Sequence, residues 1–125
     1  MNNSTASHGR TSMKPSELLT KAKAVIADPK HWAQGWYAKD AKGQSVGPRK
    51  PDAVCWCSLG ALEKVAYEED TYKTCLAATG YLFKVSAECG YIGIPYFNDN
   101  SSHEAVMKAW DKAIKLAKEE ENENR

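Results

Sequence analysis

The chain has 125 residues, of which 42% are hydrophobic and 26% charged, and its formal net charge at pH 7 is +1. These values are typical of one soluble globular domain and exclude a wholly disordered chain. No apolar run approaches the roughly 20 residues that span a bilayer, and no secretory leader opens the sequence, so we expect a cytoplasmic protein without a membrane anchor. The small net charge removes the strongest indication of nucleic-acid binding.

The two ends differ in composition from the rest of the chain. Residues 1–13 are rich in Ser, Thr and Asn and carry almost no large aliphatic side chains, which predicts a disordered tail. Residues 119–125 read EEENENR and are either the frayed end of a helix or a solvated acidic tail. The sequence therefore predicts a single helical domain at 14–118.

The first helical pattern covers residues 17–28. Ser16 is its expected N-cap, and the Asp28-Pro29 pair is expected to end it, because a residue before proline is disfavoured in the α region. The same pair can start a short second turn, with Asp28 as its cap. A loop of about 14 residues, 39–52, follows with Gly, Pro and Lys throughout, and it leaves room for a short hairpin.

The next pattern is helical over 53–69, with Asp52 as the expected N-cap. Residues 71–89 form another helical stripe, which Gly90 ends. The segment 91–97 (YIGIPYF) is interrupted by Gly and Pro, so it predicts a connection or a short edge strand. The last helix is expected to start with a capping box made by Ser101 and Glu104. The predicted fold is thus mainly α, with about four main helices.

Three segments together resemble a small family of uncharacterised bacterial and phage proteins, a domain of unknown function. The most specific is the W-C-x-x-G-A-L block at 56–62, preceded by WAQG at 32–35 and followed by FND at 97–99 with HEAV at 103–106. The resemblance covers about residues 18–117 and implies a domain boundary but no chemistry. We expect the 56–62 block to be helical, with the sulfur of its cysteine facing the core.

Cys57, His103 and Asp99 are the candidate catalytic residues. A thiol in the first turn of a helix can have a lowered pKa, a histidine can serve as its base, and a carboxylate can orient that histidine. The alternative is a buried structural cysteine and a surface histidine, which the apolar stripe around Cys57 favours. We therefore keep a cysteine-dependent enzyme as the second hypothesis.

A metal site is not favoured. Cys55, Cys57, Cys89 and His103 include the ligand types of a tetrahedral site, but the chain lacks paired C-x-x-C spacing. Residues 55 and 57 would also point in different directions on a helix. We predict no metal and no cofactor.

Aromatic and basic residues concentrate around the 39–52 loop. The segment 14–50 holds eight Lys and Arg against three Asp and Glu, an excess of +5. Such a surface suits a protein interface or a ligand groove, and it also suits single-stranded nucleic acid. The binding residues that we predict are Trp32, Trp36, Tyr37, Lys39, Lys42, Arg49 and Lys50.

The sequence favours a small, non-catalytic binding protein. A protein partner is the first expectation, and nucleic acid is the less favoured one because the whole-chain charge is nearly balanced.

Overall fold

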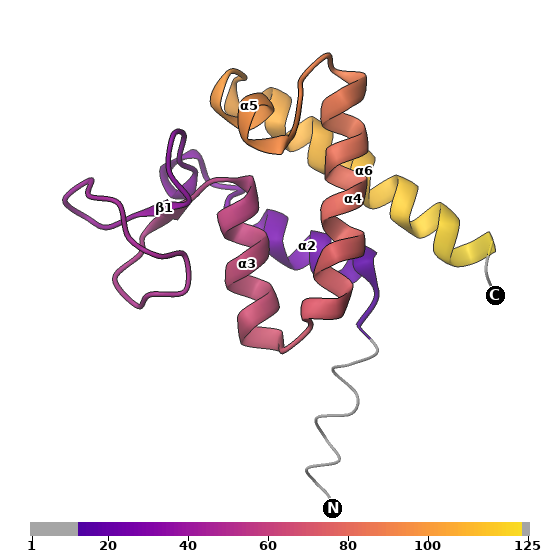
Figure 1. The fold of residues 1–125 in the computed structure, drawn as a ribbon, viewed down its shortest axis with the longest axis horizontal. Coiled ribbons are helices and arrows are strands. Elements are labelled where there is room, and N and C mark those ends of the chain that lie inside the picture. Colours follow the sequence, from indigo (N-terminus) through magenta and orange to yellow (C-terminus); the bar gives the residue numbers. More distant parts are fainter. Residues whose placement is uncertain (1–12, 124–125) are drawn as a thin grey trace, which may run out of the picture.

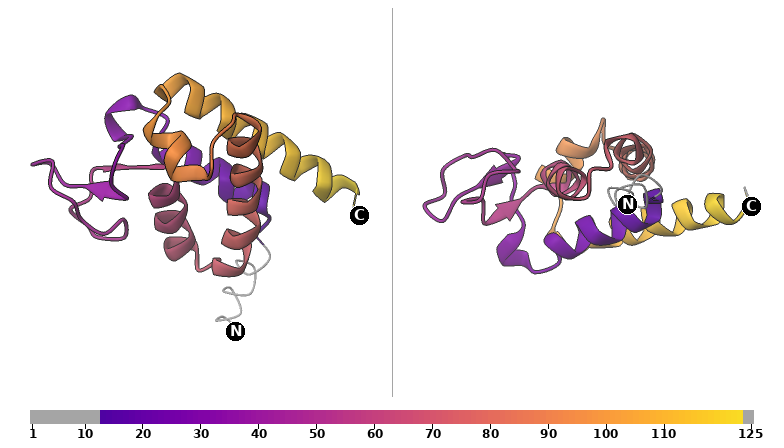
Figure 2. Two further views of the ribbon diagram at one scale, coloured as in Figure 1. Left: turned by 45° about the horizontal axis from the view of Figure 1, so that its top comes forward. Right: turned by 90° about the horizontal axis from the view of Figure 1, so that it is seen from below.

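Four long helices form two crossed layers in the computed structural model, which describes residues 13–123. Helices α3 (Ser58–Glu69) and α4 (Tyr72–Glu88) lie side by side in one layer, and α2 (Pro15–Val25) and α6 (His103–Glu123) make the other (Figures 1 and 2). A short helix, α5 (Ile94–Asp99), lies between α4 and α6 in the chain. The predicted mainly α single domain with four main helices is confirmed. Residues 1–12 of the tail predicted at 1–13 lie outside the described residues, and Met13 packs against the core.

The loop expected at 39–52 projects from one side of the helices (Figure 1). Two short strands, β1 (Ala38–Lys39) and β2 (Cys55–Trp56), pair antiparallel at its base. A further bridge between Lys39 and Ser45 folds the loop back on itself. The short turn expected after residue 28 is the 3-10 helix η1 (Pro29–His31), and Asp28 caps it by accepting a hydrogen bond from the N–H of Lys30 at 2.9 Å.

The helix expected over 53–69 begins five residues later than predicted, at Ser58, and Asp52 does not cap it. The segment before it is extended because its backbone bonds to distant chain: Val54 N donates to Lys39 O at 2.8 Å, and Cys57 N donates to Tyr37 O at 3.1 Å. Cys57 is itself the N-cap, and its sulfur accepts the N–H of Gly60 at 3.3 Å. The expectation that the whole 56–62 block is helical is therefore wrong for its first two residues.

The segment 91–97 is not an edge strand, because its second half forms α5. Pro95 sits in the first turn of this helix, where its missing N–H costs no hydrogen bond. Gly93 has φ +117°, a conformation that favours glycine, and it turns the chain into the helix. Gly and Pro, which argued against a strand, are here the start signals of a helix.

Helix α2 begins at Pro15 and ends at Val25, so the expected bounds of 17–28 are shifted. Ser16 does not cap it. Its hydroxyl and its N–H donate instead to the two carboxylate oxygens of Glu121, at 2.6 and 3.0 Å. This pair ties the start of α2 to the end of α6.

Helix α6 begins at His103 and is capped by Ser102, whose hydroxyl accepts the N–H of Ala105 at 3.1 Å. The expected capping box of Ser101 and Glu104 is replaced by this single cap, because the residue three positions after Ser102 is Ala105, whose side chain cannot accept a hydrogen bond. The helix continues through residues 119–123, the described part of the acidic end.

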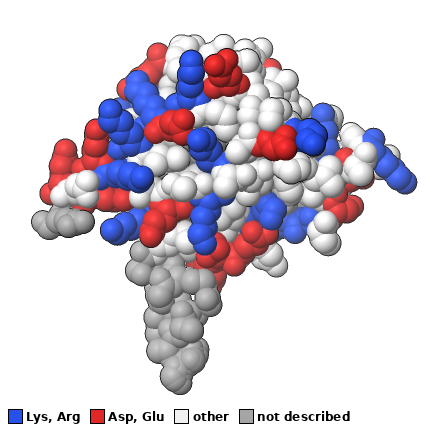
Figure 3. All heavy atoms as spheres, turned by 180° about the vertical axis from the view of Figure 1, so that it is seen from behind, with Lys and Arg blue, Asp and Glu red and all other residues white. Residues whose placement is uncertain are grey.

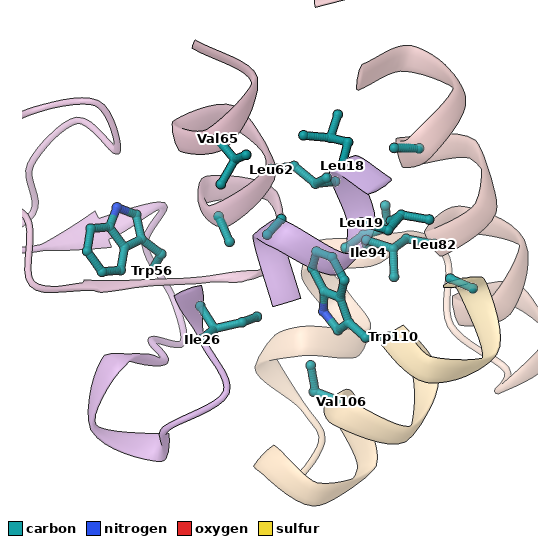
Figure 4. Packing of buried hydrophobic residues seen from close by; sticks show 14 of the residues in the cluster. Leu18, Leu19, Ile26, Trp56, Leu62, Val65, Leu82, Ile94, Val106 and Trp110 are labelled. Atoms are coloured by element: carbon teal, nitrogen blue, oxygen red, sulfur yellow. The ribbon is translucent and has the colours of Figure 1, made fainter. Parts of the chain in front are cut away.

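The core lies where the two layers cross. Side chains from α2, α3, α4, α5 and α6 point toward one another there (Figure 4), including Leu18, Leu19, Leu62, Leu82, Ile94, Val106 and Trp110. Trp110 and the two leucines of α2 are fully buried, so each stabilises the fold by about 2 kcal/mol or more relative to an exposed side chain. Within residues 13–123, no helix combines the length and the apolar character that crossing a bilayer requires.

Candidate functional site

A buried amide joins three parts of the chain beside the loop base. Asn98 of α5 is fully buried, and its Oδ1 accepts from the Trp32 indole N–H at 2.9 Å and from the Ser58 N–H and hydroxyl at 3.0 and 2.8 Å. Its Nδ2 donates to Ala33 O at 2.9 Å and to Asp99 Oδ1 at 3.1 Å. Five hydrogen bonds thus fix the start of α3 and the segment after η1 to α5.

The segment 33–37 is fastened to the end of α5 by two further groups. The side-chain amide of Gln34 donates to the carbonyls of residues 98, 99 and 101 at 3.1–3.2 Å. The N–H of Gly35 donates to Asp99 Oδ1 at 2.9 Å. These bonds fix residues 34 and 35, directly before Trp36 and Tyr37, and so help to set where the aromatic pair lies.

Gly60 allows the same segment to lie against α3. A Cβ built at Gly60 would meet the carbonyl oxygen of Tyr37 at 2.0 Å, far inside van der Waals contact. The neighbour that comes close at this glycine is the backbone of Tyr37. The glycine thereby lets Tyr37 O accept the Cys57 N–H.

A cavity of about 590 Å³ opens between these elements. It is lined mainly by apolar and small residues from the 35–37 segment, the 45–48 part of the loop, the start of α3, and α5: Gly35, Trp36, Tyr37, Ser45, Val46, Gly47, Pro48, Cys57, Pro95 and Asp99. Trp36 and Tyr37 are each 54% exposed, whereas most large aromatic side chains prefer burial. The cavity is of a size that takes a small ligand or an anchoring side chain.

Cys57 lies at the buried side of this cavity and is 8% exposed. Burial raises the pKa of its thiol, and the negative charge of Asp99 raises it further, although the N–H of Gly60 acts in the opposite direction. The expected lowering of this pKa by the helix start is outweighed by burial. The thiol is therefore neutral at pH 7.

His103 is not among the cavity-lining residues. Its Nε2 lies 2.8 Å from Ile26 O, so this nitrogen carries a proton and donates to that carbonyl, and its ring packs edge-on against Trp32 at 5.3 Å. Within residues 13–123, no hydrogen bond joins His103 to Cys57. Of the three candidate catalytic residues, the structure brings Cys57 and Asp99 to one cavity and directs His103 elsewhere.

The other predicted binding residues fall into separate places. Trp32 is held by Asn98, and Lys39 forms β1. The guanidinium of Arg49 lies over the ring of Tyr67, 4.8 Å from its centre, and donates to the hydroxyl of Tyr72 at 3.1 Å. Lys42 and Lys50 are exposed and do not line the cavity; Lys50 lines a second hollow together with Arg49.

Positive and negative side chains are mixed on the face shown in Figure 3, with no continuous basic surface. Nucleic-acid binding through residues 14–50 stays a prediction. Within residues 13–123, no group of three or more His, Cys, Asp or Glu side chains is arranged to hold a metal ion. One sequence-based reason against a metal site is that Cys55 and Cys57 would point in different directions on a helix. This reason is wrong, because the segment that holds both residues is extended.

Sequence reasoning missed Asn98 and Gly35 as the residues that hold the site. The one available signal was an Asn directly after the buried Phe97 in an apolar segment, a position where a polar side chain needs partners.

Fold and site together define a small helical domain with an aromatic-lined cavity at the base of a long loop. The chain belongs to a family of unknown function (DUF6197), whose model matches residues 10–116. No curated protein and no solved structure matches the chain.

Proposed function

We propose that this protein is a non-catalytic binding module that receives a side chain of a protein partner in the cavity beside Trp36 and Tyr37. The observation that carries the proposal is the joint placement of two half-exposed aromatic residues and the 45–48 loop around one partly open cavity. Exposed Trp and Tyr in a preformed pocket are typical of residues that dominate binding energy. The Asn98 network supports the proposal because a pre-ordered site loses less entropy on binding.

A cysteine-dependent enzyme fits the same cavity less well. A nucleophilic thiol needs a lowered pKa or a neighbouring base, and burial raises the pKa of Cys57 while His103 donates to Ile26 O. A bacterial or phage origin and a cytoplasmic location are further parts of the proposal, and they rest on the sequence resemblance and the chain composition.

A titration with the neutral probe 2-phenylethanol tests the binding function. We expect backbone N–H chemical-shift changes confined to the cavity, saturating with a Kd of about 10 mM, as is usual for a ligand of this size. Trp36→Ala should weaken binding at least about fivefold, because it removes one aromatic wall.

Phe83→Ala is the matched control, because Phe83 is also 54% exposed but lies on α4 away from the cavity lining. This variant should bind the probe like the unaltered protein. Shift changes scattered over the surface, or equal affinities for the two variants, would show that the cavity is not the binding site.

A further inference from the structure

Among residues 13–123, the cavity lining carries a single carboxylate, that of Asp99. No Lys, Arg or His of this described range lines the space. The lysines of the neighbouring loop, including Lys42 and Lys50, lie outside the lining. The other polar side chains there, among them the neutral Cys57 thiol, bring no positive charge to balance the carboxylate. The described lining is therefore mainly apolar and holds one negatively charged group.

The carboxylate of Asp99 is fixed through one oxygen only. Oδ1 accepts from the N–H of Gly35 at 2.9 Å and from Nδ2 of Asn98 at 3.1 Å. Within the described part of the chain, Oδ2 accepts no hydrogen bond from another residue. Asp99 is exposed and lines the cavity, so its carboxylate is accessible there. A carboxylate held rigidly by two donors, with one oxygen open, is suited to a charged donor from outside.

The aromatic residues select among the possible cations. Trp36 and Tyr37 line the same space as Asp99. A guanidinium is flat, is more weakly hydrated than an ammonium, and stacks on aromatic rings while its N–H groups donate to a carboxylate. An ammonium forms the charge pair but loses more hydration in an apolar pocket. The combination favours arginine over lysine.

We propose that the cavity binds an arginine side chain presented by a partner protein, with Asp99 pairing the guanidinium and Trp36 and Tyr37 contacting its faces. The inference rests on the proposed function and specifies the chemistry of its ligand. A cavity of about 590 Å³ has room for the side chain and for part of the backbone that carries it. The occupant is a partner segment because the aromatic walls continue to the surface, where each ring is half exposed.

The test compares two capped amino acids of nearly equal shape, N-acetyl-arginine methylamide and N-acetyl-citrulline methylamide, which differ in charge. Titrations followed by backbone N–H shifts should show arginine binding about fivefold to tenfold more tightly, the size expected for a partly screened charge pair with cation–π contact. Asp99→Asn keeps an oxygen for Gly35 N but removes the charge, and it should reduce this preference to less than about twofold.

Glu104→Gln is the control for loss of one negative charge, because Glu104 is exposed on α6 and does not line the cavity. Its preference for arginine should equal that of the unaltered protein. Equal binding of arginine and citrulline, or an unchanged preference in Asp99→Asn, overturns the inference. If 2-phenylethanol still binds, the proposed binding function stands. If neither amino acid derivative binds and 2-phenylethanol does not bind either, the proposed function and this inference both fail.

A second comparison tests the source of the guanidinium. The tripeptide N-acetyl-Gly-Arg-Gly-amide should bind at least about threefold more tightly than free ethylguanidinium, because backbone contacts add to the pair. Equal affinities would mean that the site takes free guanidinium compounds, and the partner-protein assignment would be wrong.

Discussion

Replacing Asn98 by alanine should destabilise the protein more than any other single polar substitution in the described chain. Its side chain accepts three hydrogen bonds, one from Trp32 and two from Ser58, and donates two, to Ala33 and Asp99. The Ser58 N–H and the Ala33 carbonyl are buried, so neither group can form a replacement hydrogen bond to water when the Asn98 amide is removed.

The magnitude follows from these two orphaned groups. Each buried backbone group left without a partner costs about 1–3 kcal/mol, and the half-buried Trp32 indole adds a smaller loss. We expect Asn98→Ala to lower the free energy of unfolding by about 3–5 kcal/mol, a large part of the 5–15 kcal/mol typical of small domains.

Urea unfolding followed by tryptophan fluorescence measures this loss. Asn100→Ala is the control, because the Asn100 side chain makes one exposed hydrogen bond, to Tyr96 O at 2.9 Å, and should cost less than about 1 kcal/mol. A loss below about 1 kcal/mol for Asn98→Ala, or equal losses for both variants, would refute the view that this amide holds the site together.

Three further predictions concern other residues. Gly60→Ala should lower Tm and cost about 1–3 kcal/mol, because its Cβ would meet Tyr37 O at 2.0 Å, whereas Gly80→Ala, which meets nothing within 4 Å, should be neutral or stabilising. Alkylation of Cys57 followed by peptide mass mapping should be slow at pH 7–8 and accelerate only above its ordinary pKa of 9.0, because burial raises the pKa of this thiol; fast reaction well below pH 8 would favour the enzyme hypothesis. Burial, with the nearby glutamates, raises the pKa of Tyr81 to about 12 from 10.0, so the unfolded chain loses this proton first. Stability should therefore fall as pH rises from 10 to 12, and urea unfolding across that range should show no such step in Tyr81→Phe.

The helices that sequence predicted well are those whose signals are local. The stripe from 71 to 89 repeats every three or four residues and ends at a glycine with φ +92°, so its existence and bounds could be read from neighbours alone. The turn at Asp28-Pro29 was equally local. The segment 53–57 has the same helical spacing but is extended, because Tyr37 and Lys39 supply partners for its N–H groups from across the loop.

Part of the candidate site could likewise be predicted from local sequence, whereas the rest depends on distant parts of the chain. Trp36 and Tyr37 were expected at a binding surface from their place beside a long loop, and the structure leaves them half exposed at a cavity. The groups that hold them depend on contacts that no local pattern encodes: Asn98 bonds to Ser58 and Trp32 across 40 and 66 positions. Glu121, which binds Ser16 across 105 positions, is another such partner.

Protection of the Cys57 thiol by a ligand tests most directly whether the cavity is a binding site, because this sulfur lies in its lining. Alkylation by iodoacetamide at pH 9.5 would be measured with increasing 2-phenylethanol, with the exposed Cys89 as internal reference. We predict that Cys57 slows in a saturable manner while Cys89 does not change, and that Trp36→Ala weakens this protection. An unprotected Cys57 at probe concentrations well above 10 mM, or equal slowing of both thiols, would contradict the assignment of the cavity as the site of binding.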